Sequence, residues 1–368
     1  MIINRYIIRT IHLGTFTALL ALVGLGLIFL FVGQLDDLGE GRYDLLEIVK
    51  FVALSVPGKI VEFMPLAVLL GSILGLGALA SNSEIIAMQA SGVSLVKLVS
   101  PVVQAAAILA VLSFLLADWV VPDSETYARS VKNLAQEKTS ALIVREGLWT
   151  KDDSRILHIG QLMPNGIARD IAIYELDKQG KLLSALKAER AIPLGQGWEL
   201  QQVNKSVISD KKMETVSFDH MVYEGNLSRQ LLEVLMIEPR QMSSNDLRAY
   251  LNFLDENKLD NRVERLIFWQ KLLAPLTIIV MCLLAFPFVL GSQRQGSSGQ
   301  RLLIGILLGL AFVVVDRLVI QLGTKFEINA LIIALLPNMA FLGIAIYMLT
   351  KKQSQGPGGK LFFKRAQA

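Results

Sequence analysis

Four residues in a short polar connector have the types and spacing of a protein-docking site. The stretch SNSEIIAMQASGVS, residues 81–94, carries one carboxylate at Glu84, followed by Ile85, Met88 and Gln89. On a helix these three positions lie near Glu84, so one side would offer an apolar contact with a carboxylate at its edge. A helix lying on a membrane surface would instead carry Lys or Arg on its polar face, and this stretch has neither. The pattern therefore predicts a helix that docks into a groove of another protein.

The expected ends of this helix are marked in the sequence. Ser81 is followed three residues later by Glu84, which fits a capping box, and Ser83 is a second candidate for the N-cap. Gly92 is the expected stop. A short helix near residues 82–92 is predicted. A purely local role for Glu84, as a helix cap, is the alternative interpretation.

A second pair of charged residues lies inside an apolar run. In VVVDRLVIQLG, Asp316 and Arg317 are adjacent, so on a helix they project in different directions and need separate partners. Ionisable groups at membrane depth are costly and often mark a substrate path. Two interpretations stay open: Arg317 and Asp316 face a substrate, or Asp316 pairs with another helix while Arg317 extends to the membrane surface.

No motif for catalysis or for nucleotide binding is present in the sequence. It contains no GxxxxGK[ST], HExxH or GxSxG pattern. The three histidines, His12, His158 and His220, are far apart in the chain and suggest neither a metal site nor a catalytic site. The chain is therefore not expected to be an enzyme, and no catalytic residue, metal ligand or cofactor is assigned to it.

The composition defines the environment in which these residues act. Of 368 residues, 53% are hydrophobic and 18% are charged, and the mean hydropathy is +0.49, which is typical of an integral membrane protein. A helix needs about 20 apolar residues to cross the hydrocarbon core. Six runs qualify, at about 10–34, 56–80, 98–121, 266–290, 302–322 and 330–350.

Basic residues beside these runs predict the orientation. Arg5 and Arg9 lie in the N-terminal segment, Arg294 and Arg301 flank the loop before the fifth run, and the tail after the last run is basic. Because basic flanks stay in the cytoplasm, both termini and residues 81–97 are predicted to be cytoplasmic. The net charge of +4 reflects this asymmetry and does not indicate nucleic-acid binding.

A long polar insertion separates the third and fourth runs and is expected on the opposite side of the membrane. It contains short alternating stretches such as RILHIGQL and DIAIYEL, separated by turn signals such as MPNG and DKQG. We expect an antiparallel β sandwich or jelly roll of about eight strands. A short amphipathic helix capped by Ser243 or Ser244 follows the strands. The single cysteine, Cys282, lies in a membrane run, so no intrachain disulfide is expected.

The predicted fold class is therefore an α-helical membrane protein with an inserted β domain, in which six transmembrane helices, three on each side, flank a β jelly roll. The expected domains are residues 1–121 for the first three spans and the short helix, residues 122–262 for the β domain and its connecting helix, residues 263–352 for the last three spans, and residues 353–368 for a cytoplasmic tail.

These elements and four specific segments resemble a known family. The segments SEIIAMQASG, GLWTKDDSRILHIGQL, LIFWQKLLAPLTIIVMCLLAFPFVLGSQR and LLIGILLGLAFVVVDRLVIQLG are similar to the LptF/LptG permeases of the lipopolysaccharide export system, and to the LptG branch more than to the LptF branch. The resemblance covers nearly the whole chain. It implies a permease subunit in the Gram-negative inner membrane, with its β domain in the periplasm.

The resemblance also implies partners and a mechanism. An LptF-like permease subunit, an LptB-like ATPase dimer and an LptC-like single-span protein are the expected partners, and lipopolysaccharide is the expected cargo. The ATPase would bind ATP and Mg²⁺, and the helix near 82–92 would be its coupling helix. Where related first helices carry a lysine suited to a lipid phosphate, this chain has Leu30, so Arg317 is the expected cation for that phosphate. Asp36 and Asp37 are expected to be a solvated rim.

Two other classes of protein are alternatives to this interpretation. A self-contained secondary transporter should have broken helices and ionisable groups near the membrane midplane. A membrane-anchored periplasmic sensor would need no platform of six helices. Co-purification of an ATPase subunit with this chain would separate these alternatives from an ATP-driven permease.

Overall fold

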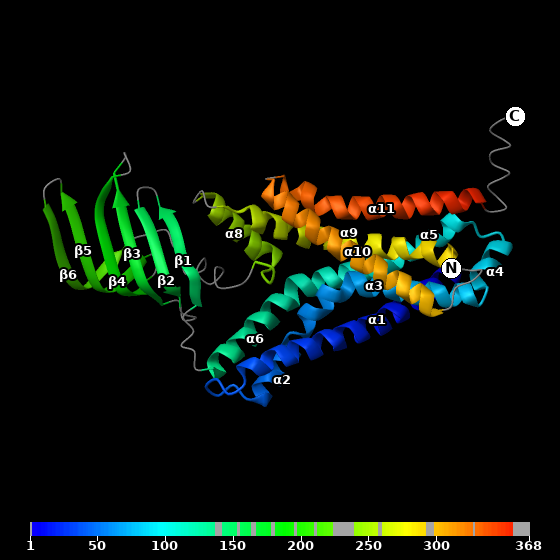
Figure 1. The fold of residues 1–368 in the computed structure, drawn as a ribbon, viewed down its shortest axis with the longest axis horizontal. Helices are drawn as coiled ribbons and strands as arrows, with labels where there is room; N and C mark the ends of the chain where they lie inside the picture. The colour runs from blue at the N-terminus through cyan, green and yellow to red at the C-terminus, as the bar shows by residue number, and fades with distance from the viewer. Residues whose placement is uncertain are drawn as a thin grey trace. The chain divides into compact units, whose positions relative to one another are not determined.

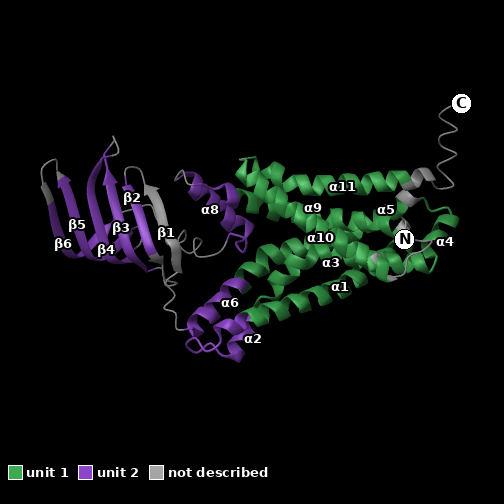
Figure 2. Cartoon of the chain, in the orientation of Figure 1, with its two compact units in different colours: residues 1–33, 52–124, 265–368 green, residues 34–51, 125–264 purple. Residues whose placement is uncertain are grey.

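The computed structural model describes residues 2–136, 142–152, 155–162, 167–177, 181–194, 197–209, 212–223, 239–256, 260–291, 298–326 and 328–355. The chain divides into two compact units (Figure 2). One unit comprises residues 1–33, 52–124 and 265–368, and the other comprises residues 34–51 and 125–264. The segment between the first two spans therefore groups with the insertion, which the sequence did not indicate.

Six long helices confirm the predicted spans (Figure 1). They are α1 (Ile2–Gln34), α3 (Val56–Ser81), α5 (Leu95–Leu115), α9 (Arg262–Gly291), α10 (Ser298–Lys325) and α11 (Ala330–Gln355). Six is also the number of helices in the described part of the chain that are long and apolar enough to cross a membrane. Three precede the β insertion and three follow it, so the protein is a multi-pass membrane protein with an inserted β domain.

The third span is longer than its apolar run. After α5 the chain passes through one π-helical turn, η2 (Leu116–Val120), into α6 (Val121–Ala135), so residues 97–135 form one continuous helical span. The β domain was expected to begin at residue 122, but the first strand begins at Leu142. Pro122 directly follows the π-helical turn, and because proline has no N–H it cannot donate a backbone hydrogen bond to the preceding turn of this continuous helix.

A short helix that was not predicted lies between the first two spans. η1 (Leu35–Asp37) is followed by α2 (Leu45–Leu54). The Asp44 carboxylate accepts hydrogen bonds from the backbone N–H groups of Leu46 and Glu47, at 2.9 and 3.0 Å. These two bonds satisfy N–H groups that have no partner within the helix. Asp44 thereby fixes where α2 begins.

Helix α3 is the most buried span, since 72% of the residues in its most apolar stretch are buried inside the protein. Its Gly71 and Gly75 face α1 so closely that no side chain fits between the two backbones. A Cβ atom at Gly71 would lie 2.2 Å from the Cα of Thr15, and one at Gly75 would lie 2.6 Å from the carbonyl oxygen of Thr10. Small residues at such contacts let membrane helices approach closely and gain dispersion energy.

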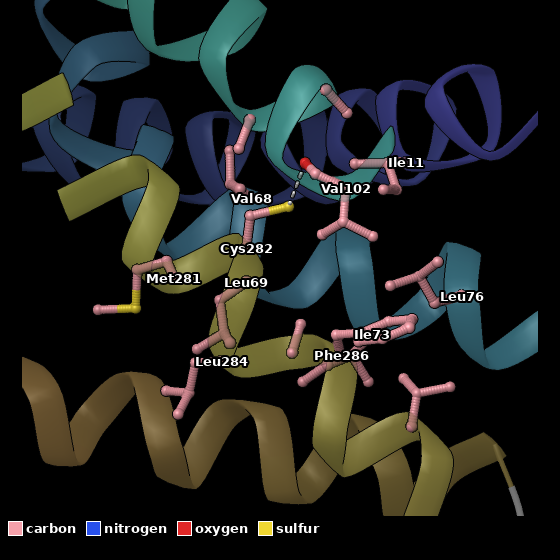
Figure 3. Close-up of a cluster of buried hydrophobic side chains, with 14 of the residues drawn as sticks. Ile11, Val68, Leu69, Ile73, Leu76, Val102, Met281, Cys282, Leu284 and Phe286 are labelled. Atoms are coloured by element: carbon pink, nitrogen blue, oxygen red, sulfur yellow. Dashed lines mark hydrogen bonds between the residues drawn. The ribbon is translucent and has the colours of Figure 1, made fainter. Parts of the chain in front are cut away.

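The same helix also meets α5, α9 and α10. Gly305 and Gly309 of α10 lie against the side chains of Ile73 and Leu66. On the side of α9, the Ser72 hydroxyl and the Cys282 thiol lie 3.3 Å apart, and Cys282 also donates to the carbonyl oxygen of Val102 on α5 at 3.6 Å. Figure 3 shows Cys282 and Val102 at the centre of the apolar cluster that joins these helices.

The insertion contains one antiparallel sheet of six strands among the described residues, in the order β1-β2-β3-β4-β5-β6 (Figure 1). The strands are β1 (Leu142–Asp152), β2 (Arg155–Leu162), β3 (Ala168–Leu176), β4 (Leu182–Leu194), β5 (Gly197–Ser209) and β6 (Lys212–Tyr223). Each described strand pairs with the next along the chain, so these six do not have the Greek-key order of a jelly roll, and about eight strands were expected. The β domain is confirmed, and the jelly-roll closure stays a prediction.

One face of the sheet forms its own core. Alternating positions on β2 to β5 bury apolar side chains, among them Ile171, Leu186, Trp198 and Leu200. This alternation is what the period of two in the sequence predicts. After the strands, α8 (Ser244–Glu256) is capped by the Ser243 hydroxyl, which accepts a hydrogen bond from the N–H of Asp246 at 3.1 Å. Of the two predicted caps, Ser243 is the one whose hydroxyl makes this bond.

Substitution of Gly71 by alanine tests the contact between α1 and α3. The added methyl group of Gly71→Ala collides with backbone atoms of Thr15, so the two helices must separate. The free energy of unfolding is expected to fall by about 1–3 kcal/mol. Gly343→Ala is the matched control, because no atom lies within 4 Å of its Cβ position. Alanine there should stabilise the helix by up to about 1 kcal/mol. Melting temperatures of the two variants in detergent measure the difference, and equal values would contradict this packing.

Candidate functional site

The predicted docking helix is present as α4 (Glu84–Ala90), directly between α3 and α5. It lies at the end of the helical unit where α1 begins (Figure 1). The chain turns from α3 into α4 at Ser83, which has a left-handed backbone with φ of 59°. Few residues other than glycine adopt this conformation, so the turn is a strained one.

The predicted capping box is wrong. The Ser81 hydroxyl donates a hydrogen bond backward to the carbonyl oxygen of Ala78, at 2.9 Å, because Ser81 is still the last residue of α3. Ser83 is the N-cap of α4 by position, but its side chain makes no capping hydrogen bond. Glu84 therefore does not take part in a capping box, and its carboxylate has other partners.

The predicted stop is correct and its geometry is specific. Gly92 has a left-handed φ of 90°, and its N–H bonds to the carbonyl oxygen of Gln89 at 3.0 Å. The N–H of Val93 bonds to the carbonyl oxygen of Met88 at 3.2 Å. These two bonds form a Schellman motif, in which glycine adopts a conformation that side chains disfavour. The motif turns the chain back toward α5.

The helix has an inner and an outer side, and the expected docking residues are divided between them. Ile85 is only 2% exposed and Met88 is half-buried, and both pack on the main apolar cluster of the helical unit. Ile86 is 48% exposed, and Gln89 is exposed. The predicted apolar face of Ile85 and Met88 is therefore turned into the protein itself. The face left for a partner is that of Ile86 and Gln89.

Glu84 connects α4 to its neighbours. Its carboxylate accepts a hydrogen bond from the Asn82 side-chain amide at 3.4 Å. The Tyr6 side chain in the first turns of α1 also interacts with this carboxylate. Glu84 is half-buried rather than fully exposed. The carboxylate therefore ties α4 to α1, which is a structural role that the sequence spacing did not reveal.

The expected substrate residues lie on two of the least buried helices. Only 11% of the residues in the most apolar stretch of α1, and 17% of those in the corresponding stretch of α10, are buried. Leu30 on α1 is half-buried, Asp316 on α10 is half-buried and has an interaction partner, and Arg317 is exposed. Arg317 stands among exposed apolar residues, Val313, Val314 and Leu318. Nothing in the described part of the chain neutralises its charge.

A second pair of charges inside the membrane spans was missed. Lys271 of α9 lies 3.4 Å from the Asp118 carboxylate of η2, and both side chains are only 12–13% exposed. Lys271 also donates to the carbonyl oxygen of Ala117 at 3.2 Å. A π-helical turn shifts the backbone hydrogen bonds, which leaves a carbonyl group to be satisfied by a side chain. Each residue is a single charge at the end of an apolar run, so the sequence gives no sign of the pairing.

The expected acidic rim is likewise part of a network. Lys132 of α6 donates to the Asp37 carboxylate and to the Gln34 side-chain oxygen, both at 2.7 Å. Its ammonium group also lies 5.8 Å and 5.5 Å from the ring centres of Tyr43 and Phe51. Burial, together with the charges of Asp37 and Glu47, raises the pKa of Tyr43 to about 12. The interpretation of Asp37 as a solvated rim residue is therefore wrong.

No cluster of three or more His, Cys, Asp or Glu side chains that could hold a metal ion occurs among the described residues. The described features define a multi-pass membrane protein, with three spans on each side of a β insertion and a short, partly exposed helix between the second and third spans.

Comparison with known proteins gives the family. The profile of the lipopolysaccharide export system permease LptF/LptG matches residues 5–351, and the chain belongs to this family. It is 33% identical over 353 residues to the lipopolysaccharide export system permease protein LptG of Haemophilus influenzae, covering 95% of this chain and 99% of that protein. LptG of Escherichia coli K12 is 33% identical over 357 residues, covering 95% of this chain and 98% of that protein.

The LptF branch is more distant. LptF of Escherichia coli K12 is 22% identical over 367 residues, covering 95% of this chain and 94% of that protein. The predicted family is confirmed, and so is the stronger resemblance to its LptG branch.

The ion pair between Asp118 and Lys271 gives a testable prediction. Lys271→Met leaves the Asp118 carboxylate largely buried without its cation, and such a loss typically costs about 3–5 kcal/mol. The double variant Asp118→Asn/Lys271→Met removes both charges and should recover at least half of that loss. Unfolding free energies of the wild type, both single variants and the double variant measure the coupling. Additive losses in the two single variants would contradict the pairing.

Proposed function

We propose that this chain is the LptG-type permease subunit of a lipopolysaccharide exporter in the Gram-negative inner membrane. The observation that carries the proposal is the end-to-end match to proteins named LptG, at 33% identity over 95% of the chain. The subunit would take lipopolysaccharide from the outer leaflet of the inner membrane and pass it to a periplasmic β bridge. Energy would come from a separate LptB-like ATPase dimer, which binds ATP and Mg²⁺.

The orientation in this proposal follows from charge and connectivity. The start of α1, helix α4 and the end of α11 lie at one end of the helical unit (Figure 1). Arg5, Arg9, Lys97 and Lys351 belong to these segments or to the first turn of α5. The positive-inside rule therefore favours the cytoplasm for this end. Since three spans separate the N-terminus from the sheet, the β domain would be periplasmic.

The partner surfaces are proposed from burial. Helices α1 and α10 leave most of their apolar residues uncovered, whereas α3 is largely enclosed. In lipid, such open faces suit other helices or an amphipathic cargo. We assign α1 and α10 to the side that meets an LptF-like subunit, an LptC-like helix and the lipopolysaccharide. Arg317 of α10 is the cation proposed for a phosphate of that lipid; Asp316 is its neighbour in the sequence, and Leu30 lies on α1.

Two of the helices after the insertion do not favour the self-contained transporter. The described parts of α9 and α10 are continuous from Arg262 to Gly291 and from Ser298 to Lys325, without the interruptions that form ion sites in such transporters. The sensor alternative does not account for a match to permeases along residues 5–351.

The proposed topology predicts which engineered cysteines are accessible. Glu214 on β6 and Ser91 after α4 are both exposed, and the native Cys282 is buried. In intact cells with a permeable outer membrane, Glu214→Cys should react with a membrane-impermeant maleimide, and Ser91→Cys should react only after the inner membrane is opened. Labelling of Ser91→Cys in intact cells would reverse the orientation.

Two neighbouring isoleucines test the proposed docking of the ATPase. Ile86→Glu places a charge on the exposed side of α4, so it should reduce co-purification of the ATPase subunit at least ten-fold and abolish ATP-driven release of lipopolysaccharide. Its melting temperature should stay within about 2 °C of the wild type, because exposed substitutions change stability little.

Ile85→Ala is the matched control on the buried side of the same helix. It should lower the melting temperature, because truncating a buried isoleucine typically costs about 2–5 kcal/mol. At temperatures where the variant is folded, it should retain the ATPase. If Ile86→Glu bound the ATPase normally and still released lipopolysaccharide, the proposed role of α4 would be wrong. If it bound the ATPase normally but released no lipopolysaccharide, the exposed side of α4 would act in coupling rather than in docking.

A further inference from the structure

A groove on the helical unit lies apart from α4 and from the residues proposed for lipopolysaccharide. It runs between α1, α3 and α5 and has a volume of about 550 Å³, which is in the range of small-molecule and cofactor sites. Its walls are almost entirely apolar and are formed by Ile8, Leu13, Phe16, Leu19, Met64, Ile108, Leu109 and Leu112. The groove is open to its surroundings, since two of its wall residues, Phe16 and Leu112, are 64% and 57% exposed.

The polar groups that line the groove all lie on α1, and the first of them along the chain are two arginines. Arg5 and Arg9 are one helical turn apart, line the groove and are exposed. Neither forms an ion pair with another residue in the described part of the chain. His12 follows one turn later, and its ring nitrogen Nε2 lies 3.2 Å from the carbonyl oxygen of Ala105 on α5. The two arginines therefore offer free positive charge at one end of an apolar channel.

A buried hydroxyl lies deeper in the same groove. Thr15 lines it and is only 2% exposed, yet its hydroxyl oxygen has no hydrogen-bond partner among the described residues. Leaving a buried polar group without a partner is unfavourable, so such a group usually has a ligand or a water molecule. At 1.5 Å per residue, Thr15 lies about 9 Å beyond Arg9 along α1.

We propose that this groove binds one anionic diacylphospholipid. Arg5 and Arg9 would bind the phosphate, the Thr15 hydroxyl would donate to an ester carbonyl oxygen, and an acyl chain would lie against Phe16, Ile108 and Leu112. Basic pockets between membrane helices are known to select anionic head groups in this way. Under the proposed topology the lipid belongs to the cytoplasmic leaflet. The site itself does not depend on that orientation or on the transport role.

The order of the groups favours a lipid over a helix of a partner protein. A phospholipid has its charge at one end, its ester groups next and hydrocarbon beyond, and the groove has its cations, its free hydroxyl and its apolar walls in the same order. A transmembrane helix would neutralise the two arginines only if it carried acidic residues at their level, whereas the phosphate of an anionic lipid supplies that charge itself.

Native mass spectrometry of the full-length chain in detergent tests the proposal, with dioleoylphosphatidylglycerol as the probe and dioleoylphosphatidylcholine as the neutral comparison. The first bound phosphatidylglycerol should be at least five-fold tighter than phosphatidylcholine. Arg5→Gln/Arg9→Gln should abolish that preference, because charge-assisted bonds to the phosphate are lost. Thr15→Val should weaken both lipids two- to five-fold, and Ile108→Trp should weaken both by filling the groove.

Matched controls separate the site from general charge effects. Lys97→Gln/Lys351→Gln removes two exposed cations from the same end of the helical unit without touching the groove, and it should keep the five-fold preference. Melting temperatures confirm that each variant is folded. The proposal is overturned if the arginine variant keeps the preference, if the lysine control loses it, or if millimolar inorganic phosphate displaces the lipid.

A crosslinking experiment tests whether a helix of a partner protein occupies the groove instead of a lipid. In the assembled complex, a photoreactive residue at Ile108 should crosslink to phospholipid. A crosslink to a partner subunit in its place would show that a protein helix fills the groove, and the lipid site would be abandoned.

Discussion

The close approach of α1 and α3 at Gly71 and Gly75 is the contact on which the helical unit depends. Within a membrane, burying apolar side chains gains little because lipid tails are equally apolar, so helices associate through close packing and local hydrogen bonds. Backbones that touch without intervening side chains give dense packing over several turns. Because α3 also holds α5 and α9 through Ser72 and Cys282, the position of α3 sets the positions of its neighbours (Figure 3). Helix α4 follows α3 directly, so the same contact determines where α4 emerges.

The sequence predicts the features that depend on local composition. An apolar run of sufficient length must become a spanning helix because its backbone groups have no other partners in lipid, and all six runs did so. Gly92 likewise predicts its own Schellman turn, because few other residues adopt its φ. The inner and outer sides of α4 could not be predicted, since Ile85 and Ile86 are adjacent and a helix of seven residues is too short for a clear periodicity. Only the packing of Ile85 against the helical core decides between them.

The missed interactions are those between residues distant in the sequence. Asp118 and Lys271 are 153 positions apart, and Asp37 and Lys132 are 95 positions apart. Each of these charges alone fits an ordinary end of an apolar run, whereas Asp316 and Arg317 stand out in the sequence because two adjacent charges interrupt one run. The capping box failed for a related reason, because Ser81 belongs to α3 and the spacing to Glu84 cannot show where one helix ends. The spacing of two residues predicts a contact between them only when both are known to lie in the same helix or strand.

The position of Glu84 gives α4 a mechanical connection to the rest of the helical unit. The helix is held on its inner side by Ile85 and Met88, and its leading carboxylate interacts with Tyr6 near the start of α1. A partner that pushes on Ile86 or Gln89 therefore acts on α1 and on the core, and not on a loose loop. Helix α1 contacts α3 through glycines, while little of the rest of its length is buried. The interaction with Glu84 of α4 and the open membrane face therefore belong to one helix, so the two are joined by a rigid element rather than by a loop.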